Sequence, residues 1–132
     1  MPIISRKVTP LIQVFDMRRS VAWYRDVLGF EVLHTHEPDG HLYWAMLKLG
    51  DAVLMLNAKY EDDKRPAAPP DRVDGHGDLT LYFDCPNVDE AYELIRAGGC
   101  DVAAPRTRYY GMRQLTVTDP DGFELCFQHP AK

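Results

Sequence analysis

The chain has 132 residues, 45% of them hydrophobic, and a formal net charge of −5, which predicts one globular domain over residues 1–132 and argues against nucleic acid as a partner. No apolar run reaches the roughly 18 residues of a membrane span, and the first residues lack the apolar core of a signal peptide. Three cysteines without C-x-x-C spacing argue against a disulfide framework or structural zinc, so we expect a cytoplasmic protein with no membrane partner.

The first predicted unit is a strand, a helix and a second strand between Leu11 and Val32. Residues 11–14 alternate in the manner of a half-buried strand. Asp16 stands at the N-cap position of the helix, and Gly29 stands where a left-handed residue closes it. The helix carries one apolar stripe at helical spacing, formed by Met17, Val21, Tyr24 and Leu28.

Three further segments complete the first half of the chain. An extended run over residues 30–32 is followed by a turn at Pro38, Asp39 and Gly40. Residues 42–49 and 53–56 read as two strands joined by the Gly50-Asp51 turn. The order β-α-β-β-β is therefore predicted for a first module over residues 8–57. Residues 58–77, with Pro66, Pro69 and Pro70, are predicted to form the connection between the halves, draped over the surface.

The same plan returns in a second module over residues 78–129. Residues 79–83 alternate as a strand, Asn87 and Glu90 resemble a capping box, and a helix is expected over Val88–Ala97, closed by Gly98. The interval from Gly29 to Gly98 is 69 residues, as is the interval from Val14 to Phe83, which favours a repeat over two unrelated strand–helix units. Later strands are expected at residues 101–103, 114–117 and 124–128, with a tight turn at residues 119–122.

Two motifs resemble the vicinal oxygen chelate superfamily of glyoxalase I, bleomycin and fosfomycin resistance proteins and extradiol dioxygenases. Residues 21–30, VAWYRDVLGF, are similar to its FYxxxLGF signature, and residues 119–122, DPDG, resemble its closing motif. The resemblance implies an α+β fold of two βαβββ modules that form a half-open mixed-sheet barrel. It also implies a small-molecule ligand in a cleft on the concave face and a homodimer.

Strand alternation indicates which side chains face that cleft, provided that no bulge shifts the register. Helices should cover the more apolar face, with Ile12, Val14, Leu79, Leu81, Phe83, Leu125 and Phe127 in the core. Arg113 is expected in a loop beside the cleft, where it would pair with an anionic ligand or simply lie at the surface. The candidate ligand-binding residues are Gln13, Trp44, Met55, Tyr82, Arg113, Cys126 and Gln128. For the candidates other than Arg113, the alternative interpretation is that they occupy ordinary core or half-buried strand positions.

The resemblance also bears on a metal. Mapped from metal-dependent relatives, the ligand positions fall at Thr9, Val53 or Met55, Asp78 and Cys126, of which only Asp78 is an ordinary ligand for a hard ion. We therefore expect no tightly held metal and no other cofactor. A displaced divalent-metal site formed by His76, Asp78 and Glu124 is the alternative.

Two classes of function remain open at this stage. One is a binding protein of the bleomycin-resistance sort, whose acidic groove takes a cationic drug. The other is an enzyme, either a metal-dependent lyase or dioxygenase with displaced ligands, or an isomerase. In the isomerase, Glu124 would be the catalytic general base if it is buried in the cleft.

Overall fold

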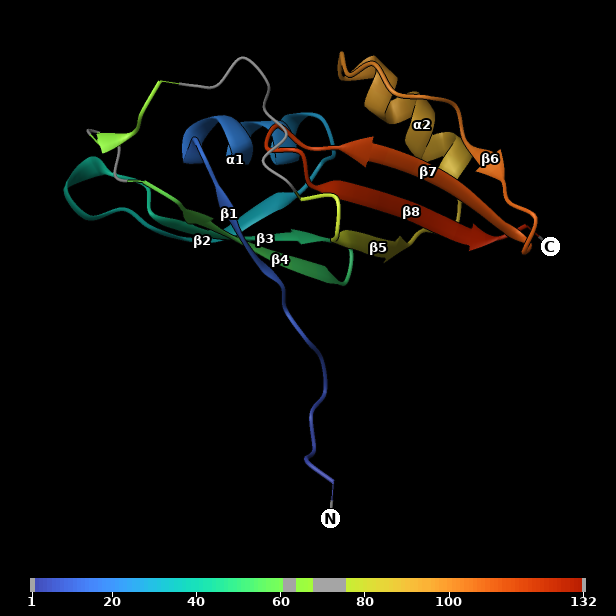
Figure 1. Ribbon diagram of the computed structural model, residues 1–132, viewed down its shortest axis with the longest axis horizontal. Coiled ribbons are helices and arrows are strands. Elements are labelled where there is room, and N and C mark those ends of the chain that lie inside the picture. Colours follow the sequence, from blue (N-terminus) through green and yellow to red (C-terminus); the bar gives the residue numbers. More distant parts are fainter. Residues whose placement is uncertain (1, 61–63, 68–75, 132) are drawn as a thin grey trace.

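The computed structural model describes residues 2–60, 64–67 and 76–131, and it contains two four-stranded sheets that each carry one helix (Figure 1). The first module has strand order β1-β4-β3-β2, and the second has the matching order β5-β8-β7-β6. In both, the first and last strands pair in parallel and the other pairs are antiparallel. The predicted α+β fold of two βαβββ modules is therefore confirmed.

The first module consists of β1 (Leu11–Val14), α1 (Met17–Asp26), β2 (Glu31–His36), a short 3₁₀ turn (Pro38–Gly40), β3 (Trp44–Leu49) and β4 (Ala52–Ala58). The second consists of β5 (Thr80–Asp84), α2 (Val88–Ala97), β6 (Arg106–Thr107), β7 (Met112–Thr118) and β8 (Glu124–Pro130).

Both helices begin at the predicted N-caps. The Asp16 carboxylate accepts a hydrogen bond from the Arg19 amide at 3.2 Å, and the Asn87 side chain accepts one from the Glu90 amide at 3.0 Å. Gly29 has φ +85°, as expected of a left-handed helix end. In the second module Gly98 (φ −76°) is the C-cap of α2, as predicted, but the left-handed conformation belongs to the next residue, Gly99 (φ +91°).

Two strand predictions also need correction. Residues 101–103 form no strand; Val102 packs against the core instead, and pairing with β7 begins only after Pro105, where Arg106 lies opposite Gln114. Leu79, expected in the core, is 40% exposed. It ends a turn in which its amide donates to the His76 carbonyl, so the alternation of β5 does not extend back to it.

The helix-covered faces of the sheets form one hydrophobic core. Alternate residues of β1, β3, β4 and β7 and two residues of β8 are buried there, among them Ile12, Val14, Leu54, Leu56, Leu115, Leu125 and Phe127. The residues between them point to the opposite side, which carries no helix in either module and which we call the open face (Figure 1). The predicted face assignment is confirmed for β1 and β4 by this burial pattern, whereas in β8 Cys126, assigned to the open face, is buried together with Leu125 and Phe127.

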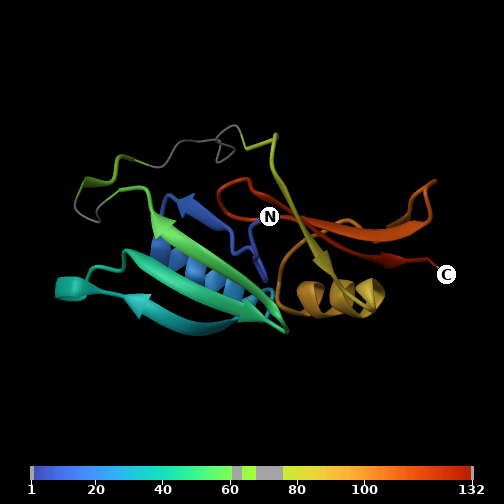
Figure 2. The ribbon, with the colours of Figure 1, turned by 90° about the horizontal axis from the view of Figure 1, so that it is seen from below.

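The two modules lie side by side (Figure 2) and are joined by buried polar contacts as well as by the core. The Tyr24 hydroxyl of α1 donates to Asp119 at 2.7 Å, and the Ser20 hydroxyl donates to Asp121 at 3.2 Å. The Phe15 amide also donates to Asp121, at 2.9 Å. The turn between β7 and β8 therefore docks onto the helix of the other module.

The predicted connection over residues 58–77 falls largely on residues 61–63 and 68–75, which lie outside the described residues. At the other end of the chain, residues 2–8 leave the body of the protein on the side of the open faces (Figure 1), with Ile3, Ile4 and Val8 at least 89% exposed. Within the described residues, neither helix has the length and apolar character that a bilayer crossing requires.

Candidate functional site

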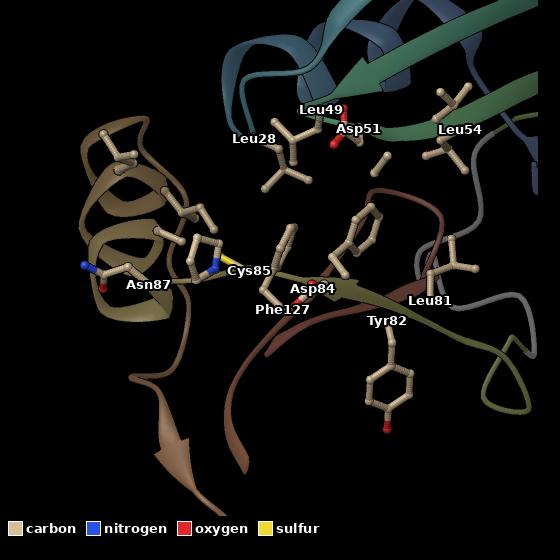
Figure 3. A pocket seen from close by; sticks show the side chains of 18 of the residues that line it. Leu28, Leu49, Asp51, Leu54, Leu81, Tyr82, Asp84, Cys85, Asn87 and Phe127 are labelled. Carbon is tan, nitrogen blue, oxygen red and sulfur yellow. The ribbon is translucent and has the colours of Figure 1, made fainter. Parts of the chain in front are cut away.

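A cavity of about 770 Å³ lies at the junction of the two modules, and its lining combines core-side residues with Val53, Tyr82 and Asp84, which alternate onto the open faces. Its wall combines the C-terminal end of α1, the β3–β4 turn, β5 and one side of α2 (Figure 3). Most lining side chains are apolar, including Leu28, Leu54, Leu81, Phe83 and Phe127. This explains why Leu81 and Phe83, expected in the core, are only partly buried. The volume is within the roughly 300–1,000 Å³ typical of ligand pockets.

Charged side chains stand around this apolar interior. Asp51 comes from the β3–β4 turn, Asp84 from the end of β5 and Glu90 from the first turn of α2, and Lys7 is the lining cation among the described residues. All four are exposed to solvent. The cavity thus offers an apolar interior with a predominantly negative edge.

The open face of the first sheet brings three of the predicted ligand-binding residues together. Gln13 of β1 lies opposite Asn57 of β4, which lies opposite Trp44 of β3, so the three form one row across the sheet. Met55 occupies the next row on the same face. Gln13 is exposed and the others are half-buried. Hydrogen-bonding, aromatic and polarisable groups are therefore adjacent on a surface that no helix covers.

The open face of the second sheet carries the other predicted residues. Tyr82 of β5 lies opposite Cys126 of β8, and Gln128 lies one row further along β8. Tyr82 is 61% exposed, whereas Cys126 is buried beneath its neighbours, and this burial raises the pKa of its thiol. A raised pKa keeps the thiol protonated, which makes Cys126 a poor nucleophile. Gln128 accepts a hydrogen bond from the Gln114 side chain at 2.8 Å.

Glu124 also lies on this second open face, but it is exposed rather than buried. Its carboxylate accepts a hydrogen bond from the Thr80 hydroxyl at 2.9 Å. The burial on which its role as a general base depended is absent from the single chain. Trp44 and Met55, the other large side chains predicted for the cleft, belong to the other sheet.

Arg113 is not where the sequence placed it. It lies within β7 and not in a loop, and it projects to the helix side, where its guanidinium donates two hydrogen bonds to Asp89 of α2 at 2.7 and 2.8 Å. A third bond joins it to Thr107 at 3.1 Å. β7 begins at Met112, two residues before the predicted start at residue 114. This earlier start determines the face on which Arg113 lies.

The displaced metal site is not assembled in the part of the chain that the structure describes. No three His, Cys, Asp or Glu side chains there are grouped closely enough to hold an ion, and this includes His76, Asp78 and Glu124. His76 instead stacks on the ring of Phe123, with centroids 3.8 Å apart. Thr9 and Met55, the mapped ligand positions of the first module, offer no hard donor beyond a hydroxyl. Whether the protein uses a metal stays a prediction.

Sequence reasoning found the open-face residues but missed the junction cavity. Its lining comes from residues that alternation assigns to the core, such as Leu54 and Phe83, and from loop positions such as Asp51 and Cys85. The available signal was an excess of apolar residues at the ends of two helices, Leu28 in one and Leu94 in the other. Leu94 is 64% exposed, which an isolated module would not require.

Comparison with known proteins places these features in a family. The sequence profile of the Glyoxalase/Bleomycin resistance protein/Dioxygenase superfamily matches residues 7–127. The lactoylglutathione lyase of Salmonella typhimurium is 29% identical over 127 residues, which cover 91% of this chain and 89% of the enzyme.

Two solved structures resemble the fold at lower identity. TioX from Micromonospora sp. ML1 has a TM-score of 0.74 at 23% identity, covering 96% of this chain and 99% of its own. A bleomycin-binding protein complexed with bleomycin has a TM-score of 0.72 at 20% identity, covering 95% and 98%.

Proposed function

The chain belongs to the Glyoxalase/Bleomycin resistance protein/Dioxygenase superfamily, and we propose that it binds a small organic ligand on the open faces of its sheets. The observation that carries the proposal is the row formed by Gln13, Asn57 and Trp44, with Met55 beside it. Such a surface stacks on a flat apolar group and orients it with neutral hydrogen bonds. The bleomycin-binding protein of the same fold gives a precedent for a small-molecule complex.

The proposed site is completed by a second copy of the chain. The open faces of the two modules lie on one side of the molecule and do not face each other (Figure 1), so a single chain supplies only one wall of a cleft at each. Leu11 and Tyr82, on the two open faces, are 50% and 61% exposed, and such apolar surface favours association. A homodimer would cover these residues and enclose the ligand.

We further propose that ligand binding needs no resident metal. The open faces carry carboxamide, hydroxyl, thioether and aromatic groups and, on the edge strand β2, the imidazoles of His34 and His36, but no three metal-ligating side chains of the described residues are grouped there, and the Glu124 carboxylate is bonded to Thr80. These groups suit an organic ligand better than a divalent ion, which prefers several carboxylate or imidazole ligands.

The two tryptophans provide the test. Trp44 lies on the open face of β3, whereas Trp23 lies in α1 and touches Tyr24. Bleomycin is the first probe, titrated into protein treated with chelator. We expect quenching of fluorescence in Trp23→Phe, where only Trp44 emits, and little change in the matched variant Trp44→Phe. Equal quenching in both variants, or binding lost with the chelator, would contradict the proposal.

The identity to lactoylglutathione lyase supports an enzyme as a second candidate. This function would need a divalent ion held at displaced positions, or Glu124 acting as a base once a partner chain buries it. The assay follows the formation of S-lactoylglutathione from the hemithioacetal of methylglyoxal and glutathione, with and without added Zn²⁺ or Ni²⁺. Metal-dependent turnover that Glu124→Gln abolishes would favour the enzyme, and no turnover under either condition would favour the binding protein.

A further inference from the structure

The junction cavity is separate from the proposed site on the open faces. Of the predicted ligand-binding residues, only Tyr82 contributes to its wall, and Figure 3 shows the Tyr82 ring directed away from Leu28 and Leu54. Gln13, Trp44 and Met55 of the first open face do not line the cavity, whereas Asp84, which lies opposite Gln128 in the second sheet, does. A ligand in the cavity would therefore use different residues from one bound on the first open face.

The interior of the cavity suits an apolar body. Leu28, which follows α1, and Leu54 of β4 line it from the first module (Figure 3), and Phe83 of β5 and Phe127 of β8 line it from the second. These side chains belong to both modules and are positioned by the same core that holds the modules together. Burial of an apolar ligand against them is favourable because it removes apolar surface of both partners from water.

The edge of the cavity determines the charge of the ligand. Asp51 and Glu90 come from opposite modules, and neither forms a hydrogen bond through its carboxylate or an ion pair within the described residues. Asp84 adds a third carboxylate, against the single cation Lys7 among the described lining residues. The positive end of the α2 dipole favours an anion, but Glu90 and its neighbour Asp89 in the first turn offset it.

We propose that the junction cavity binds an organic cation with a bulky apolar body, whose charge lies between Asp51 and Glu90. An anion of the same shape would meet uncompensated carboxylates and be rejected. A neutral ligand would gain only the apolar contacts. The two carboxylates come from different modules, so the bound cation bridges the junction.

Two probes of matched shape test the sign of the charge. Tetraphenylphosphonium is a cation, and tetraphenylborate is an anion of nearly the same size. Isothermal titration of the full chain should give tetraphenylphosphonium binding at least about tenfold tighter than tetraphenylborate binding, because each exposed carboxylate contributes about 2- to 5-fold. Raising the salt concentration should reduce this preference through screening.

Variants locate the site. Glu90→Gln and Asp51→Asn should each weaken tetraphenylphosphonium binding about 2- to 5-fold. Leu94→Lys adds a positive charge at an exposed lining position, where folding is not at risk, and should weaken the cation and strengthen the anion. The control Trp44→Phe, on the open face, should change neither affinity, so failure of the open-face proposal leaves this one intact.

Three results would overturn the inference. One is equal affinity for the two probes. Another is cation binding that ignores Leu94→Lys but is lost in Trp44→Phe, which would move the ligand to the open face. The third is the absence of binding at every protein concentration, which would mean that another segment or a second copy fills the cavity.

Discussion

The hydrogen bond from Tyr24 to Asp119 offers a direct test of how the modules are held together. Its atoms are 2.7 Å apart, Tyr24 is fully buried and Asp119 is 4% exposed. The other carboxylate oxygen of Asp119 already accepts the amides of Asp121 and Phe123 at 2.9 and 2.8 Å. Replacing Tyr24 by Phe therefore removes one partner from a buried acceptor and leaves the rest of the turn in place.

The expected loss follows from that geometry. A hydrogen bond to a charged group contributes about 1.5–3 kcal/mol, and Tyr24→Phe should lower the free energy of unfolding by this amount. Urea unfolding at fixed protein concentration, followed by circular dichroism, measures it. Tyr92→Phe is the matched control, because Tyr92 is a partly buried tyrosine of α2 whose hydroxyl has no hydrogen-bond partner among the described residues. Its effect should stay below about 0.5 kcal/mol.

The pH dependence of the loss sharpens the test. Burial raises the pKa of Asp119 above its ordinary value of 3.8, and the hydrogen bond from Tyr24 partly opposes that rise. A raised pKa means that folding takes up a proton just above pH 3.8, so stability falls as the pH rises through that window. Without Tyr24 the pKa rises further and the window extends upward. The difference between wild type and Tyr24→Phe should therefore be larger at about pH 7 than at about pH 4.

A loss below about 0.5 kcal/mol at neutral pH, or an equal loss at both pH values, would refute this account of the junction. The first result would mean that Asp119 finds another donor without cost. The second would mean that the ring hydroxyl acts by packing and not through the carboxylate.

Three further predictions concern the same fold, each measured by urea unfolding. Asn87→Ala should destabilise the protein by about 1 kcal/mol because it removes the N-cap of α2, and Asn87→Ser should restore most of the loss. Gly99→Ala should cost about 1–2 kcal/mol because its φ of +91° disfavours a β-carbon, although nothing lies within 4 Å of that carbon; no loss there would show that the turn relaxes. Leu56→Ala should cost about 2–5 kcal/mol because Leu56 is fully buried under α1, whereas Leu94→Ala at the exposed side of α2 should cost far less.

The repeat was predictable because its signals are local. Asp16 and Asn87 cap helices through contacts within three residues, and alternation along β1 and β8 is a property of each strand alone. The same locality limits the prediction. Gly98 and Gly99 are adjacent glycines, and composition does not say which of them takes the left-handed conformation.

The face of Arg113 depended on where β7 begins, and the sequence carries no sharp signal for it. Met112 and Arg113 follow Gly111, whose φ of +88° ends the preceding turn. The strand therefore starts immediately after the glycine, and its pairing with β6 fixes Arg113 opposite Thr107. A carboxylate on α2, Asp89, then lies within reach of the guanidinium, and this exposed ion pair is screened by salt.

The junction cavity could not be read from either module because it depends on how they are joined. The DPDG turn reads locally as a tight hairpin, yet Asp119 and Asp121 are buried against α1 of the other module. Those contacts set the separation between Leu28 at one helix end and Leu94 on the other helix, and thereby the space between them. Tyr24→Phe, which removes one of the contacts between the turn and α1, should therefore alter binding in the cavity before it alters the open face of either sheet. Asp119 and Asp121 anchor the modules, and Asp51, Asp84 and Glu90 line the cavity. The two sets share no residue, but they would then be coupled through α1.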